Sequence, residues 1–258
     1  PNYGLGTSES RLGEALKDFD RSKIVINTKF GHTVSGGLNY SADYIRESLE
    51  GSLKRLNMDY VDSLIIHNPP FEILNGNKSD HFAELERLKE EGKIRGYGAS
   101  VDTYDEMKVL METTESRVIE TFFNILHQDT ARAFDLAQQK NVRLIGKIPL
   151  DSGWLSGKYT AETTFSDIRE RWSREDIQTR ATLVHRIKEI LNQEHELGQM
   201  ALAFCLSYDA ITTVIPGNSS LTQLENNVKA SQISLSNALR AQLEKFYQEE
   251  VKHLNLPW

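Results

Sequence analysis

The sequence predicts an α/β fold in which parallel strands alternate with helices. Six short apolar runs, several of them rich in β-branched residues, are typical of strands that are buried on both faces. Between them lie stretches with apolar residues at helical spacing, and the strand-to-strand repeat is roughly 25 to 38 residues. Such βα units have right-handed crossovers, which place the carboxyl ends of all the strands on one side.

The first half of the chain contains four of the six predicted strands. A loop at 1–6 and a helix at 8–19 precede a strand at 23–28 that ends at Lys29. After a glycine-rich loop and a helix capped by Ser41 comes the most informative stretch, YVDSLIIHNPP at 60–70. Its apolar run 64–66 is followed at once by His67, and the Asn-Pro-Pro sequence then forbids regular structure. The next predicted elements are a helix at 81–91, a strand at 93–99, a helix at 103–111 and a strand at 117–123.

The second half continues the alternation. A helix at 129–140 and a strand at 142–148 lead into the irregular connection 151–175, whose length is typical of a functional loop. Later elements are helices at 180–196 and 199–208, a strand at 211–215, helices at 220–230 and 236–251, and an extended tail at 254–258.

A closed barrel explains this pattern better than an open sheet does. A (β/α)8 TIM barrel needs eight strands, whereas six are visible. Tyr3 lies in a loop that is followed by a helix but is not preceded by a strand. We therefore expect one barrel domain over 1–258, with the first two strands and the first helix missing from this sequence. An open six-stranded sheet is the alternative, but the sequence shows neither a topological switch point nor a Gly-x-Gly-x-x-Gly turn.

Composition excludes several classes of partner. Apolar residues make up 39% of the 258 residues and charged residues 26%, as in ordinary globular proteins. The net charge of −7 disfavours nucleic acid and anionic membranes, and no apolar run is long enough to span a membrane. The single cysteine, Cys205, excludes an internal disulfide and fits a reducing compartment. We expect a cytoplasmic protein without a nucleic-acid or membrane partner.

A proton-donating set stands at the expected carboxyl ends of three successive strands: Tyr3, Lys29 and His67. A free tyrosine has a pKa near 10, and an adjacent ammonium lowers the pKa of the phenol and eases proton transfer to a carbonyl oxygen. A neutral histidine can hydrogen-bond the same oxygen. None of them supplies a hydride, so a reduced cofactor would be required. Taken singly, each also fits a structural role: loop anchor, surface lysine or strand cap.

Six segments together resemble the active-site motifs of the aldo-keto reductase family. They are PNYGLGTSE at 1–9, INTKFG at 26–31, LIIHNP at 64–69, GYGAS at 96–100, KIPLDSGWLSGKY at 147–159 and IPGNSSLTQLENN at 215–227. The resemblance implies a (β/α)8 barrel that binds NADP(H), or less often NAD(H), and acts on small carbonyl compounds, alcohols or sugars. It points to a bacterial-type, sugar-dehydrogenase-like branch.

The resemblance also assigns roles to individual residues. Tyr3 becomes the general acid, Lys29 its charged partner and His67 the group that orients the carbonyl. Ser100 matches the residue that binds the nicotinamide carboxamide. Glu120 and Lys147 fall at two further cofactor-binding positions near the nicotinamide, where many members have glutamine and an aromatic ring. The pyrophosphate and adenosine positions correspond to Leu150, Ser152, Leu155, Gly217, Ser219, Gln223 and Asn227. The family's catalytic aspartate would precede Pro1. No metal site is predicted.

Two other functions fit the same residues. A cofactor-binding but catalytically idle regulatory subunit would keep the fold, and a Schiff-base aldolase would use Lys29 as a nucleophile. The sequence leaves the substrate, the choice between NADP and NAD, and the oligomeric state open.

Overall fold

A computed structural model describes residues 3–33, 35–192, 196–254 and 256–257. The chain divides into two compact units. The first comprises Pro1–Thr121 and Ala133–Arg143, and the second comprises Phe122–Arg132 and Leu144–Trp258. In the part of the chain that the structure describes, no helix combines the length and the apolar character needed to cross a membrane.

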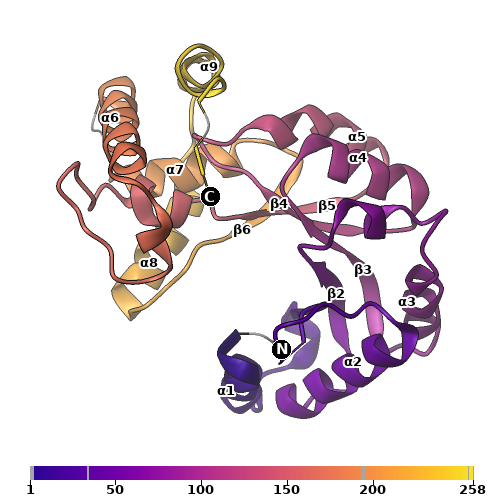
Figure 1. The fold of residues 1–258 in the computed structure, drawn as a ribbon. Helices are drawn as coiled ribbons and strands as arrows, with labels where there is room; N and C mark the ends of the chain where they lie inside the picture. Colours follow the sequence, from indigo (N-terminus) through magenta and orange to yellow (C-terminus); the bar gives the residue numbers. More distant parts are fainter. Residues whose placement is uncertain (1–2, 34, 193–195, 255, 258) are drawn as a thin grey trace. The chain divides into compact units, whose positions relative to one another are not determined.

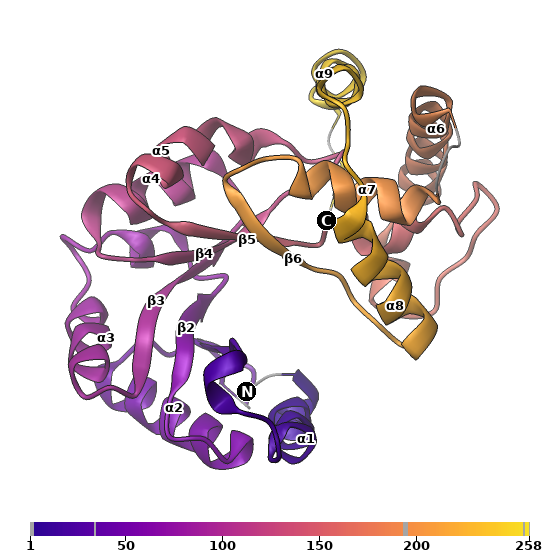
Figure 2. The same cartoon turned by 180° about the vertical axis from the view of Figure 1, so that it is seen from behind.

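The first unit is a layer of parallel strands with helices on its outer side. Strands β1 (Asn27–Phe30), β2 (Val61–His67), β3 (Ile94–Val101) and β4 (Val118–Phe122) pair in sequence order. Figures 1 and 2 show α2 and α3 on the outside of β2 and β3. The helices of this unit are α1 (Thr7–Leu16), α2 (Ala42–Leu56), α3 (His81–Glu90), α4 (Tyr104–Thr113) and α5 (Phe134–Gln139).

The register of the strands brings polar residues to one level. His67 pairs with Ser100, and Ser100 in turn pairs with Glu120. The strands that carry them approach closely beside Gly98, where a Cβ atom would lie 1.6 Å from the carbonyl oxygen of Val118. Three polar side chains from three neighbouring strands therefore start from the same height in the sheet.

The second unit contains the remaining strand pair and the C-terminal helices. Strands β5 (Arg143–Lys147) and β6 (Ile211–Ile215) are parallel, and helix α7 packs against β6. The chain leaving β6 runs into α8, as Figure 2 shows. The helices here are α6 (Arg174–Leu191), α7 (Leu197–Leu206), α8 (Leu221–Lys229) and α9 (Asn237–Phe246), which a π-helical turn extends over Tyr247–Val251.

Several predicted boundaries are wrong. The strand expected at 23–28 begins only at Asn27, and Arg21–Lys23 form a 3-10 turn. The reason is a side chain from another strand: the Asp62 carboxylate accepts hydrogen bonds from both the Ile26 amide and the Arg21 guanidinium. That pairing takes the Ile26 amide out of the sheet, so the regular ladder starts later.

The helix expected at 180–196 starts earlier, at Arg174, because Ser173 and Asp176 form a capping box. Its predicted end falls partly outside the described residues, as does the extended tail at 254–258. The helix expected at 129–140 is split into a 3-10 turn (Asp129–Ala133) and α5. The helix predicted at 8–19 ends at Leu16.

Candidate active site

The three predicted catalytic residues meet in the first unit. Thr28 donates a hydrogen bond to Glu9 of α1, so its neighbour Lys29 points to the opposite, inner face of β1. There the Lys29 ammonium lies 5.1 Å from the centre of the Tyr3 ring. The Tyr3 and His67 rings stack with their centres 5.7 Å apart. A phenol, an ammonium and an imidazole thus share one site.

An unusual backbone turn positions Tyr3. The 3-10 segment Tyr3–Gly6 contains Gly4, Leu5 and Gly6 at φ angles of 59°, 52° and 90°. Glycine is favoured at such angles because a Cβ atom strains the left-handed region. At Gly6 a Cβ would also lie 2.9 Å from the Arg55 side chain. The turn leaves Tyr3 54% exposed, so its hydroxyl can reach a substrate.

Glu120 contacts this set of three side chains rather than standing apart from it. Its Oε1 lies 2.8 Å from the Lys29 Nζ, and the side chains of Glu120 and Lys29 are only 5% and 13% exposed. Burial lowers the pKa of Lys29, but its interactions with the Glu120 carboxylate and with Tyr3 outweigh burial and raise it overall. The Lys29 side chain therefore remains a cation throughout the physiological pH range.

Two further residues near His67 were not singled out from the sequence. The His32 ring contacts the His67 ring edge-on, with centres 4.8 Å apart. Ser100 donates a 2.6 Å hydrogen bond to Asn68, the residue after His67. The position of His32, just after strand β1, is the one signal that could have drawn attention to it.

The second unit contains a groove of about 640 Å³. Six of the predicted cofactor residues line it, together with the cations Lys158 and Arg169, which come from the long connection after β5. The six are Leu150, Ser152, Gly217, Ser219, Gln223 and Asn227. Lys147 and Leu155 do not belong to this wall, and both are buried, at 6% and 0% exposure. Arg169 was missed because nothing in the spacing of that connection marks it.

The groove is chemically suited to the phosphates of a dinucleotide. The start of α8 lies in its wall. There the Ser220 hydroxyl accepts a hydrogen bond from the backbone N–H of Gln223, and the Gln223 side-chain oxygen accepts one from the backbone N–H of Ser219. A helix N-terminus attracts phosphate, and Lys158 and Arg169 add positive charge. Asp167 pairs with Arg169, so Lys158 is the stronger net source of charge.

A buried ion pair anchors the loop that forms one wall of this groove. Ile148, Asp151 and Ser152 all have positive φ, at 54°, 45° and 53°. The Asp151 carboxylate lies 3.2 Å from Arg180 Nε and 3.3 Å from His127 Nε2, with Asp151 and Arg180 fully buried. Burial raises the pKa of Asp151, but His127 and Arg180 outweigh burial and lower it overall.

Replacing Asp151 with asparagine should lower the free energy of unfolding at pH 7 by about 3–5 kcal/mol, because Arg180 would lose its buried counter-ion. The folded-state pKa of Asp151 is lowered, so its contribution is complete above its unfolded pKa of about 4 and is lost as the pH falls below that value. Urea unfolding of both proteins at pH 7 and pH 3 measures the effect. The difference in unfolding free energy between the parent and Asp151→Asn should be smaller at pH 3. The control is Asp129→Asn, which changes an exposed aspartate. Equal stabilities at pH 7 would contradict the prediction.

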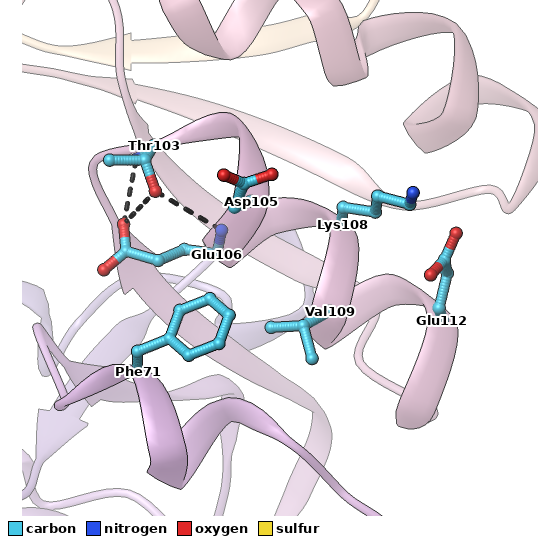
Figure 3. Close-up of a pocket in the computed structure, with 7 residues that line it drawn as sticks. All are labelled: Phe71, Thr103, Asp105, Glu106, Lys108, Val109 and Glu112. Carbon is cyan, nitrogen blue, oxygen red and sulfur yellow. Dashed lines mark hydrogen bonds between the residues drawn. The ribbon is translucent and has the colours of Figure 1, made fainter.

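A shallow depression elsewhere in the first unit shows no comparable chemistry. Figure 3 shows Phe71 beside the first turns of α4, where Thr103 and Glu106 form a capping box. None of the predicted catalytic or cofactor residues lines this depression. Two of its polar side chains, Thr103 and Glu106, are already engaged in capping the start of α4.

Comparison with known proteins identifies the family of the chain. The model of the aldo/keto reductase family matches residues 1–248. The chain belongs to that family. It is therefore an NAD(P)H-dependent oxidoreductase, since this family generally reduces carbonyl groups with nicotinamide cofactors.

Individual relatives show how broad the family is. The chain is 28% identical to the L-galactose dehydrogenase of Arabidopsis thaliana over 237 residues, 89% of this chain and 71% of that protein. It is 27% identical to the NADH-specific methylglyoxal reductase of Escherichia coli, covering 92% of this chain and 78% of that protein. Among solved structures, aldo-keto reductase AKR11C1 from Bacillus halodurans superposes with a TM-score of 0.81 at 26% identity, covering 99% of this chain and 83% of that one. The fold is thus that of the TIM-barrel aldo-keto reductases.

Proposed function

We propose that the protein transfers a hydride between NADP(H), or NAD(H), and a small aldehyde or ketone, or the corresponding alcohol or sugar, with Tyr3 as general acid. The observation that carries this proposal is the meeting of Tyr3, Lys29 and His67 on one face of the first unit. L-galactose and methylglyoxal, the compounds named for two relatives, are both small and oxygen-rich, which indicates the class to test first.

In the proposed reaction each of the three side chains has a separate task. Tyr3 gives its hydroxyl proton to the substrate oxygen, and the Lys29 ammonium stabilises the negative charge left on the phenol. His67 hydrogen-bonds the same oxygen and fixes the orientation of the carbonyl. The reduced nicotinamide supplies the hydride.

The groove of the second unit would hold the phosphate end of the cofactor. Ser219 and Gln223 at the start of α8 offer hydrogen-bonding groups, and Lys158 offers charge. We assign Ser100 to the nicotinamide carboxamide. Lys147 and Leu155 are also proposed cofactor residues, although their side chains are buried outside the groove wall.

The raised pKa of Lys29 favours this function over a Schiff-base aldolase. A Schiff base forms from a neutral amine, whereas Glu120 keeps Lys29 protonated. Borohydride treatment with methylglyoxal should therefore leave Lys29 unmodified in the intact protein.

Turnover separates the proposed enzyme from an idle regulatory subunit. The protein should oxidise NADPH or NADH when methylglyoxal is added, or reduce the oxidised cofactor with L-galactose. Fluorescence titration of cofactor binding runs in parallel. Cofactor binding without turnover of any aldehyde, ketone or sugar in a broad panel would favour the regulatory subunit.

We further propose that one barrel domain spans residues 1–258 and that the protein acts in the cytoplasm. A single buried thiol, Cys205, fits a reducing compartment. Native-state proteolysis tests the first statement, because the two units of a single domain should be cleaved at the same rate. Cell fractionation tests the second statement.

Cofactor preference should be weak in the parent protein and stronger after Gln223→Arg. The helix start offers hydroxyls and amides to a 2′-phosphate, and charge-assisted bonds are roughly twice as strong as neutral ones. NADPH should bind at most about tenfold better than NADH, about 1.4 kcal/mol, and the arginine should widen that ratio. Gln232→Arg makes the same change on an exposed turn outside the groove and serves as the control.

The preference is measured as the ratio of the dissociation constants for NADH and NADPH, obtained by fluorescence quenching at fixed ionic strength. A parent preference above about a hundredfold would mean that a basic residue already grips the phosphate. Lys158, which lines the groove, would then be the first residue to replace.

A further inference from the structure

The Glu120 carboxylate reaches Lys29 across the inner face of the sheet. Lys29 is on β1 and Glu120 is on β4, with β2 and β3 between them. In a flat sheet, three strand spacings would separate their backbones by about 14 Å. Because the two charged groups are only 2.8 Å apart, the strands must curve so that both side chains point inward to a common place.

This contact joins Glu120 to the Tyr3 hydroxyl through a single ammonium. The Lys29 ammonium lies 2.8 Å from the Glu120 carboxylate and 5.1 Å from the centre of the Tyr3 ring. A lysine buried without a partner tends to lose its proton and is free to change rotamer. The carboxylate counteracts both tendencies, since it attracts the charge and fixes the direction of the side chain.

We propose that Glu120 is a positioning residue that holds the charged Lys29 side chain against Tyr3. This inference rests on the proposed function, because it concerns the same proton transfer. It differs from the role that the resemblance gives to the Glu120 position, which is to hold the nicotinamide. A glutamine would retain the shape of the side chain and lose its charge, so Glu120→Gln separates the two roles.

The first arm of the test is kinetic. Glu120→Gln should lower kcat by about tenfold or more, since proton transfer from Tyr3 is typically worth about 10² to 10⁴-fold and depends on the Lys29 ammonium being held beside the phenol. The decline of activity at high pH should begin at a lower pH, and the dissociation constants of both cofactors should stay within about twofold. A loss of cofactor affinity at unchanged kcat would overturn the proposal and restore the nicotinamide-binding role.

The second arm does not depend on activity. Competitive acetylation between pH 7 and pH 11, read by mass spectrometry of the Lys29 peptide, reports the protonation of Lys29 directly. The exposed Lys245 is the internal reference. Lys29 should react more slowly than Lys245 in the parent, and Glu120→Gln should move its reaction curve to lower pH. An unchanged curve would overturn the proposal whatever the activity shows.

Matched variants protect the result from effects on folding. Glu115→Gln removes an exposed carboxylate near the start of β4 that pairs with Arg117, and it should leave the Lys29 curve unaltered. Glu120→Asp keeps the charge and should retain more activity than Glu120→Gln. If the parent protein lacks turnover but Glu120→Gln still shifts the curve, the proposed function fails while the coupling of Glu120 to Lys29 stands. If the parent protein turns over substrate and Glu120→Gln leaves the Lys29 acetylation curve unchanged, only the proposal about Glu120 fails.

Discussion

Replacing Tyr3 with phenylalanine should lower kcat by about 10² to 10⁴-fold, the range typical of a lost general acid. The phenylalanine ring keeps the stacking on His67 and the contact with the Lys29 ammonium, so the site should retain its shape. The dissociation constant of the cofactor should change little, because the hydroxyl acts on the substrate oxygen. Steady-state kinetics with methylglyoxal and a parallel cofactor titration give both quantities.

Tyr60→Phe is the matched control for this experiment. Its ring lies against the Arg21 and Arg95 guanidiniums, and its hydroxyl accepts a hydrogen bond from Arg95. It should retain the parent kcat. A Tyr3→Phe protein with more than half of the parent activity would contradict the assignment of Tyr3 as the proton donor.

Replacing Lys29 with methionine should abolish measurable turnover and also destabilise the protein. The phenol loses the cation that stabilises its ionised form, and Glu120 is left as a buried carboxylate without its partner. Breaking a buried pair by removing one member costs about 3–5 kcal/mol, which urea unfolding at pH 7 can measure. Kinetics at saturating cofactor measure the first effect.

The double variant Lys29→Met with Glu120→Gln separates the two effects. Removing both charges should recover much of the lost stability, because no buried charge then remains unpaired. It should not recover activity, because the ammonium beside Tyr3 is still absent. Recovered turnover in the double variant would show that Lys29 is structural and not part of the chemistry.

The sequence predicted the elements whose signals are local. The apolar run before His67, stopped by the Asn-Pro-Pro sequence, gave both the strand and its polar end, because both depend on neighbouring residues. Ser41 and Ser220 marked two helix starts for the same reason, since a cap bonds to amides three residues away. The signal for the start of α6 at Arg174 is equally local, because Ser173 begins a capping box. The apolar periodicity instead placed the predicted start at residue 180.

By itself, the sequence determined the order of strands and helices, the identity of Tyr3, Lys29 and His67 as a candidate set, and the family through its motifs. The tertiary structure alone decided that Glu120 pairs with Lys29 and that Asp151 is buried between His127 and Arg180. Both contacts join side chains that are far apart in the chain, where no periodicity or spacing links them. They form because curvature and packing bring opposite charges together away from water, where an unpaired charge would be costly.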